Sequence, residues 1–245
     1  MNPHILFAVS GRVLRQLRRD RRTAMMLLVL PCVLITLLWW MFTDMPGDLF
    51  NRFGPGLLAL FPFIVMFLVT SVTTLRERSS GTLERLLAMP MGKLDFLGGY
   101  ALAFGLVATV QAALAVTLSV GLLGLNIAGP LWLLGLVAVV DAVLGTALGL
   151  FVSAFAQTEF QAVQFMPLFV IPQIILCGLF VPRDLMPPVL HAISNVLPLS
   201  YATDAMQHLV RSTSTAEVWR DLAVVAAFAV GALALGAATL RRRTP

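Results

Sequence analysis

The stretch from Leu131 to Phe155, LWLLGLVAVVDAVLGTALGLFVSAF, contains a single charged residue, Asp141. An α-helix rises about 1.5 Å per residue, so about 20 residues cross the hydrocarbon core of a bilayer, which is about 30 Å thick. In lipid, a helix is the only single segment that satisfies its own backbone hydrogen-bonding groups. The stretch therefore predicts a membrane-spanning helix.

Five further stretches have a similar length and apolar character. They are Thr23–Phe42, Pro55–Thr74, Phe96–Leu123, Phe165–Val181 and Leu222–Leu240. The fifth span of the chain contains Pro167 and Pro172, each of which lacks a backbone donor and disturbs a helix interior. We therefore predict six spans, of which the fifth is short and broken.

The composition of the chain agrees with a protein of the bilayer. Of its 245 residues, 59% are hydrophobic and only 12% are charged, and the mean hydropathy is +0.91. A soluble domain has about a quarter of its residues charged. The composition excludes a disordered chain, a disulfide scaffold and a water-soluble enzyme, and it predicts an all-α, polytopic membrane protein.

The basic residues predict its orientation. They lie in short clusters between the apolar runs, which is typical of membrane topology rather than of nucleic-acid binding. If the N-terminus is cytoplasmic, 13 of the 17 lysines and arginines fall on the cytoplasmic side. We therefore expect a multi-pass protein of the cell (inner) membrane with both termini in the cytoplasm.

Residues 1–22 precede the first span and have helical periodicity. Leu6, Val9 and Leu17 fall on one side, whereas the arginines fall on the other. The arginines expected at the membrane interface include Arg12, Arg15 and Arg19. Such an amphipathic helix lies in the interface, with its cations at anionic headgroups. It is either a simple anchor or also a collar that touches a cytoplasmic partner.

The segment between the second and third spans, TLRERSSGTLERLLAMPMGKLD (residues 74–95), predicts a short cytoplasmic helix. Gly81 ends the preceding helix, Glu84 suits the first turn of a new one, and Pro90 stops it. From the residues alone, this helix of about 80–90 is also compatible with an amphipathic turn that only joins two spans.

The outer segment, about residues 181–215, is apolar but interrupted. Pro182, Pro187, Pro188 and Pro198 leave no stretch long enough to span the membrane. Two short helices, about 189–197 and 200–210, would form a re-entrant helical hairpin, which is tolerated where protein covers its backbone. The alternative is a surface loop.

Asp141 is the charge within the fourth span, where an ionised carboxylate is costly. We expect it to face either a neighbouring helix, in a packing role, or the substrate route. Gly145 and Gly149, which follow it at a spacing of four residues, allow a close approach of a second helix.

Three motifs carry a resemblance to a known family. They are Glu77-x-x-x-Gly81-Thr82-x-Glu84-x-Leu86-x-x-x-Pro90, Gly178-Leu-Phe-Val-Pro182…Leu185…Pro188, and Leu197-Pro198-Leu-Ser-Tyr201…Asp204-Ala. Their order and spacing over the whole chain resemble the permease subunits of type-2 ATP-binding-cassette (ABC) exporters.

The resemblance implies that residues 81–89 form a coupling helix seated in a groove of a separate ATPase, within a permease domain of residues 23–245. The contacts that it implies are Glu77, Gly81, Thr82, Glu84 and Arg85, and the candidates for the gate or pathway are Asp141, Pro172, Pro182, Pro198 and Tyr201. The implied partners are two cytoplasmic ATPase subunits, a second permease copy or homologue, and membrane lipids.

The chain has no Gly-x-x-x-x-Gly-Lys-Ser/Thr phosphate loop. We therefore expect ATP and Mg²⁺ on the partner ATPase, and no cofactor, metal or nucleic acid bound by this chain. Its 16 Phe and 11 Met favour soft apolar contacts, and hence a hydrophobic drug-like compound or a lipid as substrate rather than a polysaccharide.

Two other functions stay open at the level of the sequence. An ion-coupled secondary transporter would use Asp141 as its intramembrane ionisable group. An intramembrane metalloenzyme would use Asp204 and His208, one helical turn apart, with His191 nearby.

Overall fold

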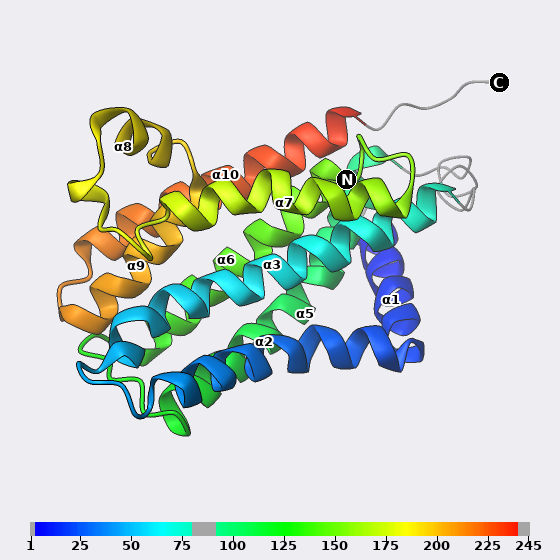
Figure 1. Cartoon of the computed structure of the whole chain (residues 1–245). Coiled ribbons are helices and arrows are strands. Elements are labelled where there is room, and N and C mark those ends of the chain that lie inside the picture. Colours follow the sequence, from blue (N-terminus) through cyan, green and yellow to red (C-terminus); the bar gives the residue numbers. More distant parts are fainter. Residues whose placement is uncertain (1–2, 80–91, 240–245) are drawn as a thin grey trace.

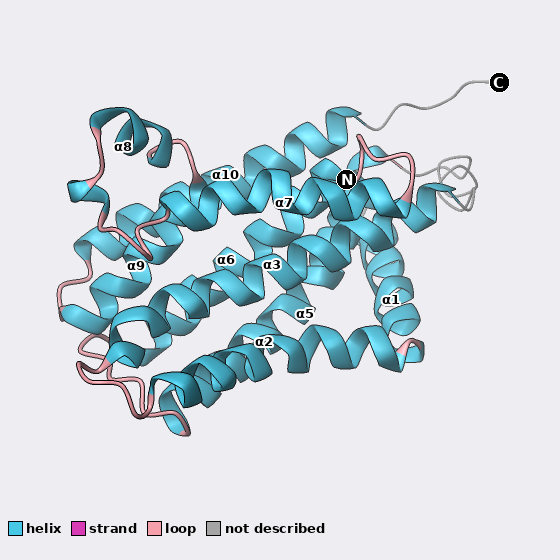
Figure 2. Cartoon of the chain, viewed as in Figure 1, coloured by secondary structure: helices cyan, strands magenta, loops and turns pink. Residues whose placement is uncertain are grey.

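A computed structural model describes residues 3–79 and 92–239, and within these ranges the chain forms helices and loops without any strand (Figures 1 and 2). The elements are α1 (Pro3–Arg19), α2 (Arg21–Phe42), α3 (Leu49–Ser79), α5 (Lys93–Gly121), α6 (Leu131–Val152), α7 (Glu159–Leu176), the 3-10 turn η1 (Arg183–Leu185), α8 (Pro188–Ser194), α9 (Pro198–Arg211) and α10 (Ala216–Thr239).

Six of these helices, α2, α3, α5, α6, α7 and α10, are long and apolar enough to cross a membrane, which confirms the predicted number. Their bounds differ from the sequence prediction most at the second, fifth and sixth spans, each of which begins six residues earlier than predicted, at Leu49, Glu159 and Ala216. The first turns of these helices include polar residues, so hydropathy alone places their beginnings too late.

The fifth span, α7, also corrects the prediction of a broken helix. It is one helix of 18 residues that includes both Pro167 and Pro172. Next to Pro172, the side-chain amide of Gln173 donates a hydrogen bond to the carbonyl of Phe169 at 3.0 Å. A side chain thus supplies a donor in the turn where proline removes one, which is how membrane helices tolerate proline.

The core of the bundle is built around α6, which packs most extensively against α3, α10 and α5. A Cβ atom added at Gly145 would lie 2.5 Å from the carbonyl oxygen of Phe63, and one added at Gly149 would lie 2.5 Å from that of Phe67. The predicted close approach at these glycines is confirmed, and the partner helix is α3.

The two ends of the bundle differ (Figure 1). At one end, α1 lies across the bundle, and α10 finishes at the same end. At the other end, α9 packs into the bundle against α10, α3 and α6, whereas α8 stands out from it and exposes Val189, Leu190 and Ile193. These are called the α1 end and the α8 end below.

Candidate functional site

At the α1 end, the interfacial helix is docked rather than loosely attached. Val9 and Val13 are buried against Phe96 and Tyr100 of α5. A Cβ atom at Gly99 would lie 2.6 Å from Cγ1 of Val9, so this close packing of α1 on α5 requires glycine. The apolar side predicted for residues 1–22 therefore packs in part on protein.

An ion pair joins the same helix to α3. Nη2 of Arg12 donates to both carboxylate oxygens of Glu77, at 2.8 and 2.7 Å. The Glu77 side chain is only 5% exposed, whereas that of Arg12 is 32% exposed. The structure thus places Arg12 and Glu77, which the sequence assigned to headgroups and to the ATPase groove, against each other.

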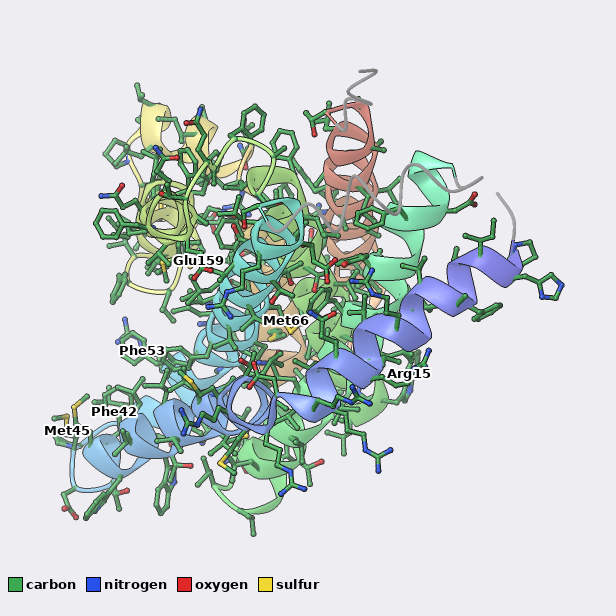
Figure 3. All side chains as sticks on the ribbon, turned by 90° about the vertical axis from the view of Figure 1, so that its right-hand side faces the viewer. Arg15, Phe42, Met45, Phe53, Met66 and Glu159 are labelled. Carbon is green, nitrogen blue, oxygen red and sulfur yellow. The ribbon has the colours of Figure 1, made fainter. Side chains whose placement is uncertain are left out.

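A second, exposed pair lies at the same end (Figure 3). Nε and Nη2 of Arg76, on α3, donate to the two carboxylate oxygens of Glu159 at the start of α7, at 2.7 and 3.0 Å. Exposed pairs contribute about 1 kcal/mol or less, because water screens them. This pair orients the beginning of α7 more than it stabilises the fold.

In the middle of α6, Asp141 is completely buried. Neither of its carboxylate oxygens has a hydrogen-bond partner among the described residues. It lies one and two helical turns before the two glycines that contact α3, and so on the same side of the helix. Of the two roles predicted for Asp141, this position favours packing between helices.

At the α8 end, a turn at Gly178 leads into the 3-10 turn that carries Arg183. Gly178 has φ of +88°, a conformation that favours glycine. A Cβ atom there would also lie 3.3 Å from Cγ of Arg183. The glycine therefore lets the chain reverse directly behind this arginine.

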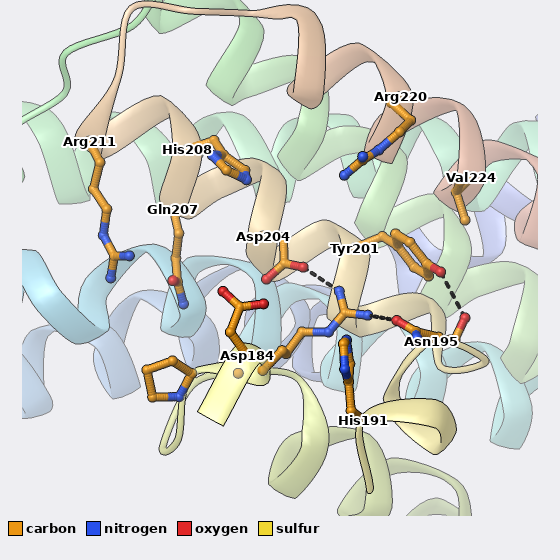
Figure 4. Close-up of a pocket in the computed structure, with 13 residues that line it drawn as sticks. Asp184, His191, Asn195, Tyr201, Asp204, Gln207, His208, Arg211, Arg220 and Val224 are labelled. Atoms are coloured by element: carbon orange, nitrogen blue, oxygen red, sulfur yellow. Dashed lines mark hydrogen bonds and ion pairs between the residues drawn. The ribbon is translucent and has the colours of Figure 1, made fainter. Parts of the chain in front are cut away.

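Arg183 holds the outer segment together (Figure 4). Its guanidinium pairs with Asp204 and donates to Asn195, its Nε donates to Ser194 at 3.0 Å, and its Cζ lies 5.2 Å from the centroid of the Tyr201 ring. One arginine thus connects η1, the end of α8 and the first half of α9.

The same residues border a pocket of about 590 Å³. Its wall combines cations, carboxylates and imidazoles, namely Arg183, Arg211, Arg220, Asp184, Asp204, His191 and His208. The hydroxyl of Tyr201 donates to the backbone oxygen of Asn195 at 2.8 Å. Burial raises the pKa of Asp204, and the Arg183 guanidinium opposes part of that rise.

Two of the predicted gate residues, Pro182 and Tyr201, line this pocket. Pro182 directly precedes η1. Pro198 is buried as the first residue of α9. Pro172 lies in α7, and its neighbour Gln173 accepts a hydrogen bond from the backbone N–H of Leu199 at 3.3 Å. Gln173 therefore ties the proline-containing part of α7 to the start of α9.

Comparison with known proteins now assigns the family. Residues 5–210 match the ABC-2 type transporter family. The chain belongs to this family.

Three relatives of the ABC-2 chain are informative. The probable multidrug ABC transporter permease YbhR of Escherichia coli (strain K12) is 30% identical over 169 residues, 69% of this chain and 46% of the relative. The linearmycin resistance permease protein LnrN of Bacillus subtilis (strain 168) is 26% identical over 186 residues, which cover 73% of this chain and 48% of the relative. ABC transporter G family member 20 of Dictyostelium discoideum is 30% identical over 168 residues, which cover 67% of this chain and 23% of the relative.

The chain spans about half the length of the bacterial relatives that it matches. The family and the six apolar helices make it a multi-pass membrane protein of the ABC permease class. Of the residues predicted to contact the ATPase, Gly81, Thr82, Glu84 and Arg85 lie outside the described ranges.

Two residues of this ABC-2 permease escaped the sequence prediction. Arg183 was assigned only to the outer side, and Gln173 was not singled out. An amide next to a proline inside an apolar span is a usable signal for Gln173, because a buried amide needs partners. For Arg183, the signal is an arginine at the start of a largely apolar segment, which needs acceptors nearby.

The structure also shows what the proposed metal ligands do. Asp204 pairs with Arg183, and Nδ1 of His208 lies 3.0 Å from Oε2 of Glu217. Within residues 3–79 and 92–239, no group of three or more His, Cys, Asp or Glu is placed to hold a metal ion. Asp204 thus serves in an ion pair with Arg183, and His208 contacts Glu217.

Proposed function

We propose that this chain is the membrane subunit of an ATP-driven exporter that moves a hydrophobic drug-like compound or a lipid out of the cytoplasm or inner leaflet. The observation that carries the proposal is the family match over residues 5–210. Relatives named as multidrug and linearmycin resistance permeases support a hydrophobic substrate. The phosphate loop is missing from the printed sequence, so a separate ATPase binds ATP and Mg²⁺.

The proposed orientation has the α1 end in the cytoplasm. The arginines of α1 and of the start of α2, together with Arg76, all belong to this end. Positive charge is retained on the cytoplasmic side of a membrane protein. The α8 end, with its pocket, then faces outward, and both ends of the chain are cytoplasmic.

Coupling to the ATPase takes place through the segment of about 80–90, with Gly81, Thr82, Glu84 and Arg85 as its contacts. Glu77 acts from behind this segment. Since Glu77 lies in the last turn of α3 and holds Arg12 of α1, a displacement of the segment is passed to α1 and α3 together. The transition is a rigid-body movement of helices, with no chemistry in the permease itself.

The active complex contains two permease chains and two ATPase subunits. Most residues of α2 and α7 are not buried within the chain, so both helices have apolar surface left for a second copy or for lipid. The second copy completes the pathway between the two chains. The outer gate of this pathway is the segment of about 181–215. Its gate residues are Pro182, Pro198 and Tyr201, and Pro172 of α7 is a further candidate.

The test begins with purification of the subunit from its native membrane, to identify the ATPase that accompanies it. The complex is then reconstituted into vesicles, and ATP-dependent movement of a fluorescent lipid or dye is measured. We expect Glu84→Arg to leave insertion and dimerisation intact and to abolish ATPase association or substrate-stimulated hydrolysis. Asp44→Arg, an equivalent change at an exposed position near the α8 end, should have no such effect.

Two results would contradict the proposal. One is uphill transport by the isolated chain on a proton or sodium gradient without ATP, which would favour the ion-coupled transporter. The other is full coupling in the Glu84→Arg complex, which would remove the assigned role of the segment of about 80–90.

A further inference from the structure

An apolar groove runs between α1, α2 and α5 at the α1 end. It encloses about 260 Å³, and its lining residues are apolar except for Arg18 at its rim. The apolar lining residues are Leu14, Leu17, Ala24, Leu28, Leu106, Val107 and Val110. They come from the second half of α1, the first two turns of α2 and the middle of α5.

Beside this groove, four arginines form a cationic pocket of about 440 Å³. They are Arg15, Arg18, Arg19 and Arg21. Arg18 lines both the groove and the cationic pocket. Figure 3 looks onto this end and shows α1, with Arg15 labelled, lying across the bundle.

The charge of the four arginines is not neutralised within the described part of the protein. None of them forms an ion pair there, and Arg15 donates only to the carbonyl oxygen of Gly11, at 3.1 Å. The neighbouring carboxylate, Asp20, accepts from the backbone N–H and the hydroxyl of Thr23, at 3.2 and 2.6 Å, and so caps α2. The fold therefore keeps a cluster of cations without an anion.

The groove continues from this cluster into the hydrocarbon. Leu106 and Val110 are about half exposed, and both lie within the membrane-spanning part of α5, Gly98–Gly121. On α2, Leu28 lies seven residues beyond Arg21, or about 10 Å along the helix. The apolar groove thus begins at the arginines and extends along the helices away from water.

We propose that this site holds one anionic phospholipid from the leaflet on the α1 side. The phosphate lies among Arg15, Arg18, Arg19 and Arg21, and an acyl chain follows the groove past Leu28 and Val107. A protein partner on the aqueous side could meet the arginines but not the part of the groove at the depth of the hydrocarbon. A phospholipid supplies the anion and the chain in one molecule.

The bound lipid would fix the turn at Asp20, where α1 meets α2. Because α1 is also tied to α3 through Arg12 and Glu77, the lipid and the ion pair hold the same helix at two places along its length. The site concerns the attachment of α1 and does not depend on the transported substrate or on ATP.

The experiment measures bound lipid and thermal stability of the full chain in a neutral detergent. Dioleoyl phosphatidylglycerol is compared with dioleoyl phosphatidylcholine, which has the same chains, and with glycerol phosphate, which has no chain. Bound lipid is counted by native mass spectrometry. We expect phosphatidylglycerol alone to be retained and to raise the melting temperature.

Charge and groove are tested separately. A Lys or Arg near an anionic lipid surface contributes about a fivefold gain in binding. We therefore expect Arg18→Gln to lower the affinity for phosphatidylglycerol about fivefold, and the double variant Arg18→Gln with Arg21→Gln to lower it about 25-fold. Arg211→Gln, at the α8 end, is the charge control. Ala24→Phe fills the groove and should reduce retention without a change of charge, whereas Ala113→Phe on the exposed surface of α5 should not.

Three outcomes would overturn the proposal. Equal stabilisation by phosphatidylcholine would mean a general lipid surface, and an equal effect of glycerol phosphate would mean an anion patch without a chain site. If the arginine variants retain phosphatidylglycerol but lose the ATPase, the surface belongs to a protein partner.

Discussion

At each end of the molecule an arginine joins neighbouring helices, Arg12 at the α1 end and Arg183 at the α8 end, and the two joints are built differently. At the α1 end, Arg12 gives both of its hydrogen bonds to a single carboxylate, Glu77, which is 5% exposed. At the α8 end, Arg183 divides its donors among Asp204, Asn195 and Ser194, beside a pocket of about 590 Å³. A pair whose carboxylate is buried favours one arrangement, whereas contacts divided among several partners can be exchanged one by one. We therefore expect the α1 joint to transmit movement and the α8 joint to rearrange.

The largest effect should follow from breaking the α1 joint. Arg12→Ala removes the guanidinium that donates to both oxygens of the buried Glu77 carboxylate, and loss of one member of a buried pair destabilises by roughly 3 kcal/mol. The measurement is thermal or denaturant unfolding in detergent. Arg15→Ala, three residues along the same helix, removes an exposed arginine and should change stability by less than about 0.5 kcal/mol.

Equal stability of the Arg12→Ala and Arg15→Ala variants would mean that the pair with Glu77 contributes nothing beyond surface charge. The double variant Arg12→Ala with Glu77→Ala sharpens the comparison. It removes the buried carboxylate together with the guanidinium, so we expect it to recover part of the stability lost by Arg12→Ala alone.

The α8 joint should be weaker. We expect Arg183→Ala to cost about 2 kcal/mol, because charged hydrogen bonds are lost but the carboxylate of Asp204 stays 28% exposed to water. Arg211→Ala is the matched control, since Arg211 lines the same pocket without an ion pair among the described residues. A loss for Arg183→Ala as large as that for Arg12→Ala would erase the proposed difference between the ends.

The effect of pH separates the two joints further. Burial raises the pKa of Asp204, and Arg183 opposes that rise. The pKa of Asp204 should therefore be higher in the Arg183→Ala variant than in the wild type. A folded-state pKa above the unfolded one means that ionised Asp204 lowers stability at neutral pH and that protonation removes this loss. The stability gap between wild type and Arg183→Ala should therefore narrow as the pH falls from neutral towards the ordinary Asp pKa of about 3.9. A gap that widens on acidification would contradict this sign.

A smaller effect is expected where the α8 joint meets the bundle. Gln173→Leu removes the acceptor of the Leu199 N–H and the donor to Phe169, and one such buried bond contributes about 1 kcal/mol. Hydrogen exchange at the start of α9 is the more specific measurement, because it should increase there and not at α1. Gln164 is an exposed amide on the same helix, so Gln164→Leu should change neither the stability nor the hydrogen exchange at the start of α9.

Much of this architecture could be predicted from the sequence, because the number of spans depends on the length and polarity of single segments. The close contact of Gly145 and Gly149 with α3 is predictable for the same reason, although the partner helix is not. The joints are harder to predict. Arg12 falls on the polar side of its helix, and its acceptor lies 65 residues away in the chain, so periodicity cannot identify Glu77. The same holds for Gln173 and Leu199, which are 26 residues apart.

The smallest change in stability is expected at Asp141, between the two joints. Its carboxylate oxygens have no hydrogen-bond partner among the described residues, so Asp141→Asn removes no bond, keeps the shape of the side chain and leaves no charge to desolvate. We expect the free energy of unfolding to change by less than about 1 kcal/mol. ATP-driven transport should survive the substitution, because a packing role needs volume and not a titrating carboxylate. If transport is lost while the variant unfolds at the wild-type temperature, Asp141 acts on the substrate route or in ion coupling. In that case α6 does more between the two ends of the bundle than pack against its neighbouring helices.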